Sequence, residues 1–361
     1  MILRHVSYSS FTRVLLSTAL ASGCGATGAS TPGNTLAQGG ESSGNGGGAG
    51  AGNTSGSTNV SDVGGGANIG GSPGVGGGVQ PTGGVPATGG APPTGGMPAT
   101  GGTTCTPGTQ IGSTYSTNYF VMAFPQLSPF YVFNNGWSAP STLKELTTAG
   151  TLENISAYDT CTAGTISWST TYNWTGASNQ VKAYPAAILG WQSTKGFQVN
   201  PAVSGLPKTI STLSSAKCSW AYSVTGGAAQ NISFDIWLHN TTCSSTAITA
   251  TTTPSDEVMI WLYSNGGVNA LGCCNATQSN VNISGAAWNL YTGTTSLNGA
   301  TVAVHSFVRT SNTSSIQNLD ILAFLNNLNL GSRCLSSIQA GTEVYTGAGT
   351  LKTDSYSCTL Q

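Results

Sequence analysis

The sequence of 361 residues has few charged side chains and few histidines. Its Lys and Arg number 10 and its Asp and Glu 11, so only 6% of the chain is charged and the net charge is −1. A near-neutral chain without a basic stripe lacks the electrostatic footprint of nucleic-acid binding, so we expect no nucleic-acid partner. Neutral polar partners such as sugars fit this composition better than polyanions do.

The scarcity of histidine also argues against a metal centre. His239 and His305 are the only histidines beyond the N-terminal segment, and no CxxC pair accompanies them. These are too few for a zinc site built on imidazole, so we predict no metal and no cofactor. Beyond the N-terminus, no apolar run is long enough to cross a bilayer.

The N-terminus is typical of an export signal over residues 1–24. Arg4 and Arg13 supply positive charge, and a short apolar run, residues 14–21, ends in "LASGC". A small-residue run ending in Cys24 resembles a bacterial lipoprotein cleavage box, so we expect Cys24 to be lipidated. The prediction is an extracellular or cell-surface protein, an outer-membrane lipoprotein that meets the membrane only through this lipid. Plain secretion with cleavage nearby is the alternative.

The 9 cysteines agree with an oxidising compartment. Setting Cys24 aside leaves an even number, for which disulfides are the default expectation. Metal binding is the competing interpretation, but Cys273 and Cys274 have no metal-ligand partner at a useful spacing.

Residues 25–104 have the composition of a flexible linker. They contain 29 of the 51 glycines, only Glu41 and Asp62 as charges, and Thr-Gly-Gly repeated every six residues near their end. No apolar pattern here repays the entropy of folding, so we expect a tether with an end-to-end distance of roughly 50 Å.

Residues 105–361 predict one large all-β domain. Alternating segments separated by Gly, Asn, Ser and Thr turns favour a sandwich of two antiparallel sheets; they are 165–174, 231–240, 257–264, 301–308 and 342–357. One segment, residues 314–331, has apolar residues near helical spacing and ends at Gly331, so we expect a single helix there.

Several strands have unlike faces. Trp168, Tyr172 and Trp174 share one face of segment 165–174, and alternation in "EVMIWLYS" places Glu257 with Met259 and Trp261. Aromatic side chains gathered on the outer face of one curved sheet make a cleft on which sugar rings can stack. The alternative is that these rings belong to a two-layer core.

Carboxylates are rare enough in this domain for their positions to matter. Glu257 and Glu343 lie on strand-like segments, whereas Glu145 and Glu153 have the pattern of surface residues and Asp256 that of a solvated turn. Hydrolysis of a glycosidic bond needs two carboxyl groups, so Glu257 and Glu343 are candidates if their strands are neighbours. The alternative is a pair of solvated carboxylates at strand ends.

Short motifs around both glutamates resemble those of glycoside hydrolase family 12, in the family order and over the whole domain. "EVMIW" with Glu257 resembles the nucleophile strand, and "GTEVYTG" with Glu343 resembles the acid/base strand. The other matching motifs are "NNGW" (134–137), "NQVKAYP" (179–185), "FDIW" (234–237), "WNLYTG" (288–293) and "HSFV" (305–308).

The resemblance implies a β-jelly roll whose concave cleft binds β-1,4-glucan, and an endo-acting, retaining glucanase. It makes Glu257 the nucleophile, Glu343 the acid/base and Asp235 the residue that orients the nucleophile. It also implies a polysaccharide substrate, a role in polysaccharide catabolism and a monomer. Cellulose, mixed-linkage glucan and xyloglucan are not distinguished.

The resemblance further assigns substrate contacts and one disulfide. The substrate-binding residues are Asn135, Trp137, Met259, Trp261 and Tyr345, and the disulfide joins Cys105 to Cys161. The aromatic face of segment 165–174 adds Trp168 as a predicted substrate contact. Val344, Tyr345 and Gly136 depart from the family pattern, as do the insertions that carry Cys218, Cys243, Cys273 and Cys274. The pairing of the other cysteines is open.

Two other interpretations remain. A non-catalytic surface domain that binds carbohydrate would share the sandwich and its aromatic face, but would not need both glutamates. The related sandwich xylanases share the mechanism, but the "MIW" after Glu257 and the "GT" before Glu343 favour the glucanases.

Overall fold

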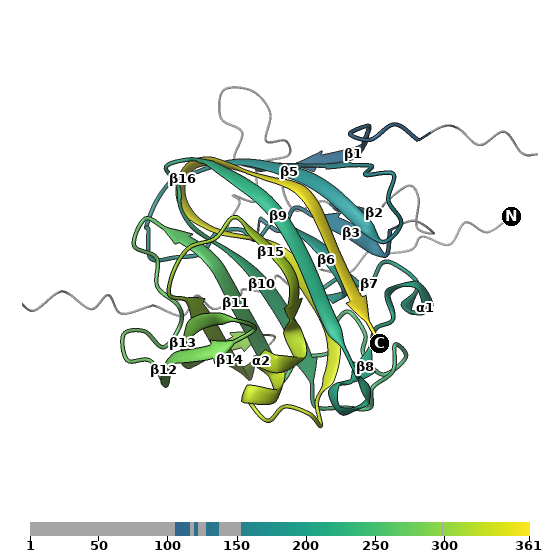
Figure 1. Cartoon of the computed structure of the whole chain (residues 1–361), viewed down its shortest axis with the longest axis vertical. Coiled ribbons are helices and arrows are strands. Elements are labelled where there is room, and N and C mark those ends of the chain that lie inside the picture. The colour runs from purple at the N-terminus through teal and green to yellow at the C-terminus, as the bar shows by residue number, and fades with distance from the viewer. Residues whose placement is uncertain (1–104, 116–118, 122–127, 137–152, 298) are drawn as a thin grey trace, which may run out of the picture. The chain divides into compact units, whose positions relative to one another are not determined.

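The computed structural model describes residues 105–115, 119–121, 128–136, 153–297 and 299–361 (Figure 1). The predicted export signal, the linker, Trp137 and Glu145 lie outside the described residues. Within them, no helix is both long enough and apolar enough to cross a membrane.

The described strands form two layers. Layer one contains, in order, β2 (Tyr119–Val121), β3 (Phe130–Phe133), β6 (Ala186–Gln192), the first part of β16 (Cys334–Leu360), β10 (Ala229–His239), β11 (Asp256–Asn265), β14 (Ala300–Arg309), β13 (Ala286–Leu297) and β12 (Gln278–Ile283). Layer two contains β1 (Gln110–Tyr115), β4 (Glu153–Tyr158), β5 (Thr165–Trp174), the second part of β16, β9 (Ala216–Gly226) and β15 (Ser315–Asp320). The short strands β7 (Gly196–Phe197) and β8 (Lys208–Thr209) pair with β6 and β16. The predicted β-sandwich is confirmed.

Strand β16 passes from one layer to the other and joins them (Figure 1). Its first part pairs with β6 and β10, and its second part pairs with β5 and β9. Gly347 lies at the bend with a φ of 96°, and a Cβ there would approach Ala228 Cα to 3.0 Å. A side chain at this position is therefore disfavoured both by conformation and by space.

The core lies between the two layers. Residues alternate along β10, so that Phe234, Ile236 and Leu238 enter the core from layer one. From layer two, Trp168 and Trp220 stack with ring centroids 5.8 Å apart, and Tyr356 meets both rings. Trp168, Trp220 and Tyr356 are among the largest fully buried side chains of the described residues, so they contribute strongly to the apolar area of the core.

The predicted helix over residues 314–331 is only partly correct. Ser315–Asp320 is strand β15, which pairs with β9, and the helix α2 is confined to Ile321–Asn327. The exposed edge of β9 offers backbone partners that outweigh the local apolar spacing, and the side chain of Asp320 caps the helix by accepting from Leu322 N at 3.1 Å. A second, shorter helix that we did not predict, α1, spans Pro201–Ser204.

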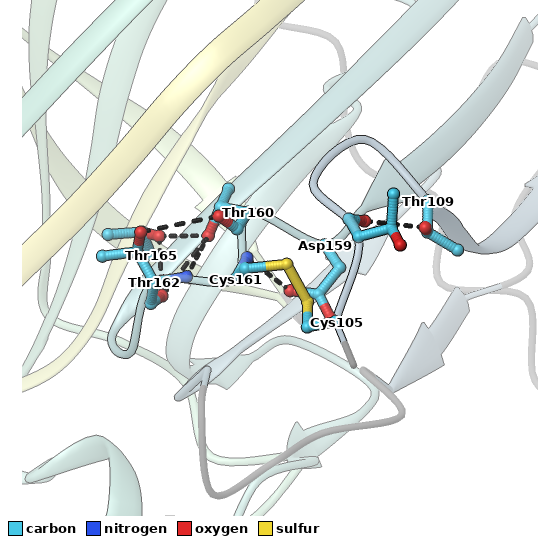
Figure 2. Close-up of a disulfide and its surroundings, with 8 residues drawn as sticks. Cys105, Thr109, Asp159, Thr160, Cys161, Thr162 and Thr165 are labelled. Carbon is cyan, nitrogen blue, oxygen red and sulfur yellow. Dashed lines mark hydrogen bonds between the residues drawn. A yellow bond between two sulfur atoms is a disulfide. The ribbon is translucent and has the colours of Figure 1, made fainter. Parts of the chain in front are cut away.

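The predicted disulfide between Cys105 and Cys161 is present (Figure 2). It fastens the start of the described domain to the turn between β4 and β5, where Asp159 Oδ1 accepts from Cys161 N at 2.8 Å. Among the described residues, Cys105, Asp159 and Cys161 are the one group whose ligand atoms lie close enough together to hold a metal ion. The two sulfur atoms are bonded to each other, however, and so are not available as thiolate ligands. The remaining pairs are Cys218–Cys358, Cys243–Cys334 and Cys273–Cys274.

Candidate active site

Three adjacent strands of layer one, β16, β10 and β11, carry the predicted catalytic residues. In the register of the sheet, Glu343 of β16 lies opposite Asn231 of β10, and Glu257 of β11 lies opposite Trp237 of β10. Residues directly opposite one another point to the same side of a sheet. The two glutamates therefore flank β10 on one face, turned away from the core, which we call the carboxylate face. Their strands are separated by β10 rather than paired directly.

Asp235 occupies β10 between these two register positions. Trp237 Nε1 donates to its Oδ2 at 3.0 Å, and its buried carboxyl group also shares a hydrogen bond with Glu257. Burial, and then the negative charges of Glu257 and Glu343, hold the pKa of Asp235 well above its usual range. A protonated Asp235 is thus available to share its proton with Glu257 and to stabilise a negative charge there.

The pKa values of both glutamates are raised toward neutrality. Burial raises the pKa of Glu257 to about 8, with a further contribution from the charge of Glu343 and an opposing one from a hydrogen bond with Asp235. Burial also raises the pKa of Glu343 to about 7, against the hydrogen bonds that it receives. Because the two charges repel one another, the pair loses its protons in separate steps. Between these two steps the pair retains one proton, as an acid and a nucleophile acting together require.

Glu343 is held by β10 and by its own strand. Asn231 Nδ2 donates to Glu343 Oε2, and Asn231 Oδ1 accepts from the backbone N of Glu343 at 3.3 Å. Ser233 Oγ fixes the amide by donating to Asn231 Oδ1 at 3.0 Å. Tyr345, a predicted substrate contact, donates its hydroxyl to Glu343 Oε2 at 3.5 Å. These bonds leave the carboxyl group of Glu343 little freedom to rotate.

The motif "NQVKAYP" supports the acid/base strand from the side. Lys182 Nζ donates to the carbonyl of Tyr345 and, at 2.6 Å, to that of Ala177. Tyr184 donates its hydroxyl to the carbonyl of Ser233 at 2.9 Å. Burial and the charges of Asp235 and Glu343 raise the pKa of Tyr184 well above its usual range, which places this ring beside the carboxylate face.

Asn135 is the described part of the motif "NNGW". Its side chain is half-buried, and its carbonyl accepts from the backbone N of Tyr184 at 2.9 Å. Trp137 lies outside the described residues. A sugar contact by either residue therefore stays a prediction.

Met259 and Trp261 project from the predicted face but are covered. Their exposed fractions are 5% and 2%, because Val268 and Ala270, from the connection between β11 and β12, pack on them. The sequence placed both side chains on the face of Glu257 correctly. It did not reveal that a neighbouring loop occupies that part of the face.

The prediction that Trp168 binds substrate is wrong. Its exposed fraction is 0%, and its ring stacks on Trp220 between the two layers. Tyr172 and Trp174, which share its face, are buried in the same core. The alternation of β5 was identified correctly, but β5 belongs to layer two, and the aromatic face of that layer is the one that meets the core.

Two acidic residues expected at the surface are also buried. Glu153 is fully buried, accepts from Trp174 Nε1 at 3.0 Å, and has its pKa raised by burial to about 8. Asp256 accepts from Arg333 Nε at 2.8 Å and pairs with His305 at 3.6 Å. Burial opposes ionisation of Asp256, but hydrogen bonds from His305, Ser255 and Arg333 outweigh it and lower its pKa to about 2.

Sequence reasoning missed Asn231. It lies four residues before Asp235, and on an alternating strand this spacing puts both side chains on one face. Lys182 and Tyr184 belong to a motif that was recognised without roles for its members, because their partners come from strands far away in the sequence.

A comparison with protein families agrees with this geometry. The model of the family described as "Glycosyl hydrolase family 12" matches residues 128–361, which include every residue of the carboxylate face named above. The chain belongs to glycosyl hydrolase family 12.

Curated relatives of this chain carry different descriptions. "Xyloglucan-specific endo-beta-1,4-glucanase A" of Emericella nidulans is 30% identical over 237 residues, which cover 64% of this chain and 85% of that protein. "Inactive glycoside hydrolase XLP1" of Phytophthora nicotianae is 28% identical over 236 residues, which cover 64% of this chain and 86% of that protein.

A solved structure of the family has the same fold. The family 12 xyloglucanase from Bacillus licheniformis, in complex with a ligand, superposes with a TM-score of 0.55 and 28% identity. The match covers 69% of this chain and 99% of that one. The jelly-roll sandwich predicted from the sequence is thus the fold that this chain shares with its family.

Proposed function

We propose that this family 12 domain is an endo-acting glycoside hydrolase that cleaves β-1,4-glucan with retention of anomeric configuration. The observation that carries the proposal is the placement of Glu257, Asp235 and Glu343 on one face of three adjacent strands, with pKa values raised toward neutrality. A retaining glycosidase needs one ionised and one protonated carboxyl group, held about 5–5.5 Å apart.

In the first step Glu257, ionised, attacks the anomeric carbon while the glycosidic C–O bond breaks. Glu343 gives its proton to the leaving oxygen, and a glycosyl-enzyme ester remains on Glu257. In the second step Glu343, now ionised, takes a proton from water as that water attacks the anomeric carbon. The ester bond breaks, Glu257 leaves as a carboxylate, and the sugar retains its configuration.

The neighbours of the two glutamates suit these roles. A proton on Asp235 favours the ionised form of Glu257 before the attack, and Trp237 holds Asp235 in place. Asn231 and Tyr345 donate to Glu343 and stabilise its carboxylate after the proton has left. Asn135 and Trp137 are proposed to hold sugar units farther along the chain.

The substrate is proposed to be cellulose, mixed-linkage glucan or xyloglucan, degraded for polysaccharide catabolism. Xyloglucan is the first polymer to test, because a relative and a solved structure described above carry that substrate in their names.

The test is release of reducing ends from xyloglucan, barley β-glucan, carboxymethylcellulose and xylan. We expect Glu257→Gln and Glu343→Gln each to lose at least about 10³-fold in activity on a β-1,4-glucan. Asp354→Asn, which changes an exposed carboxylate paired with Lys352, is the matched control and should retain full activity. A preference for xylan would favour the related sandwich xylanases instead. The first product anomer, followed by NMR, tests retention.

A non-catalytic carbohydrate-binding domain is the second candidate, favoured by the relative whose name describes it as inactive. Binding of the unmutated protein to these polymers without any release of reducing ends would support this candidate and contradict hydrolysis.

The protein is further proposed to be exported as a monomer and anchored at the cell surface through a lipid on Cys24. In a bacterial host, Cys24→Ser should move the protein from the membrane fraction to the soluble fraction. Unchanged fractionation would support plain secretion.

A further inference from the structure

The connection between β11 and β12, residues 266–277, crosses the carboxylate face. Val268 and Ala270 pack on Met259 and Trp261 of β11, together with Tyr291 of β13. The loop therefore packs against the sheet and covers one side of the carboxylate face, which carries Glu257, with apolar side chains.

The loop is fixed where it meets β13. Leu271 lies over Gly293, where a Cβ would come within 2.8 Å of Leu271 Cγ. Gly272, with a φ of 88°, presses so closely on the backbone of Thr292 that any side chain there would clash with the Thr292 carbonyl. The backbone N of Cys273 closes this turn by donating to the carbonyl of Ala270 at 3.0 Å.

The disulfide between the adjacent residues Cys273 and Cys274 follows directly after this anchored turn. Cys273 is half-buried and Cys274 is exposed. Downstream, Thr277 N donates to the carbonyl of Leu290 at 2.7 Å, so both ends of the disulfide segment are tied to β13. The disulfide therefore lies in a segment held at both ends, and its sulfur atoms offer a partly exposed apolar contact surface.

The register places this surface close to the nucleophile. Gly293 lies opposite Val304 of β14, and Val304 lies beside Glu257 of β11, so all three share the carboxylate face. Two strand spacings separate Gly293 from Glu257, a distance of about 10 Å. A glucan chain that passes Glu257 therefore reaches the disulfide within a few sugar units.

We propose that the Cys273–Cys274 disulfide is a sugar-binding surface at the edge of the substrate site, contacting the apolar face of a glucose ring. Sulfur is polarizable and gains dispersion energy against C–H groups, and a surface that is already rigid loses little entropy on binding. This proposal rests on the proposed function for the class of its ligand, but concerns binding alone.

The test is protection of the disulfide by ligand in the full chain carrying Glu257→Gln, which keeps the substrate uncut. Reduction by a phosphine is followed by alkylation and mass spectrometry, with and without saturating cellohexaose or xyloglucan oligosaccharide. We expect reduction of Cys273–Cys274 to slow at least about threefold, while Cys105–Cys161, which is exposed and remote, is reduced at an unchanged rate. Equal rates with and without ligand, when calorimetry shows that the ligand is bound, would overturn the proposal.

A double variant supplies the second measurement. Cys273→Ser with Cys274→Ser should raise KM for the oligosaccharide about 5-fold and change kcat less than about 2-fold, since uniform binding is lost. Unchanged KM, with a circular dichroism spectrum like that of the unmutated protein, contradicts the contact. Protection without any hydrolysis by the unmutated chain would retain the sugar surface and reject only the hydrolase proposal.

Discussion

Among single residues, Asn231 has the clearest link to catalysis, because it donates to the carboxylate of Glu343 and accepts from its backbone. In Asn231→Ala the ionised form of Glu343 loses a donor, so the pKa of Glu343 should rise. We expect kcat to fall by about 10- to 100-fold, the usual cost of a hydrogen bond to a charged group, and the alkaline limb of the pH profile to move upward. Asn173→Ala, on the exposed side of β5, is the matched control; an unmoved alkaline limb would refute the assignment.

Glu153 makes a prediction about stability rather than activity. Its pKa is about 8 in the folded chain and 4.5 in the unfolded one, so the folded state binds the extra proton between these values. The stabilisation that this proton contributes is therefore fully present below pH 4.5. It is lost as pH rises toward 8, by up to about 1.4 kcal/mol per pH unit.

Glu153→Gln should remove this loss while keeping an acceptor for Trp174 Nε1. We expect the free energy of unfolding of the variant, measured with urea, to rise relative to that of the unmutated protein between about pH 5 and about pH 8. The difference should reach a few kcal/mol at the upper end. Asp354→Asn, at an exposed site, should show no such trend. A constant difference at all pH values would mean that Glu153 is already ionised in the folded state.

At the scale of elements, the bend of β16 at Gly347 is the critical feature. Gly347→Ala places a Cβ 3.0 Å from Ala228 Cα in a conformation that side chains rarely adopt, so we expect a loss of about 2–4 kcal/mol. Gly164→Ala, at a φ of 72° with no atom within 4 Å of the added Cβ, isolates the conformational part and should cost about 1 kcal/mol. Equal thermal midpoints for the two variants would show that space at the bend is not limiting.

The elements also show what sequence patterns can and cannot predict. Period-two alternation located β5, β10, β11 and β14 to within a few residues, because each has one face in the core. Alternation does not reveal which face of a strand meets the core, so Trp168 was assigned to the wrong side. Nor does it foresee a strand pair formed at long range, which is why residues 315–320 were predicted as helix.

The candidate active site was likewise predicted where the signal is local in the sequence, and missed where it depends on distant strands. Glu257, Glu343 and Asp235 were located because the motifs around them are local, and the register then brought them to one face. Asn231 and the buried Glu153 escaped because their importance depends on partners in other strands. The covering of Trp261 by Ala270 depends on the path of a loop, which no pattern in the strand itself encodes.

For the whole molecule, the carboxylate face predicts a pH profile. The pair formed by Glu257 and Glu343 gives up its last proton in the region of about 7 to 8, and without that proton no acid remains to assist the leaving group. We expect kcat/KM on a β-1,4-glucan to fall tenfold per pH unit above this region. An activity that stays constant to about pH 10, in a protein that remains folded, would contradict a carboxylic acid as the proton donor.

The continuity of β16 has a consequence for biosynthesis. Residues 334–360 are central to both layers and contain Glu343, yet they leave the ribosome after every other strand described here. Neither layer is continuous until then, because β16 joins β6 to β10 in one layer and β5 to β9 in the other. A product that stops before residue 334 lacks β16 and with it Glu343, so we expect it not to form the two-layer fold.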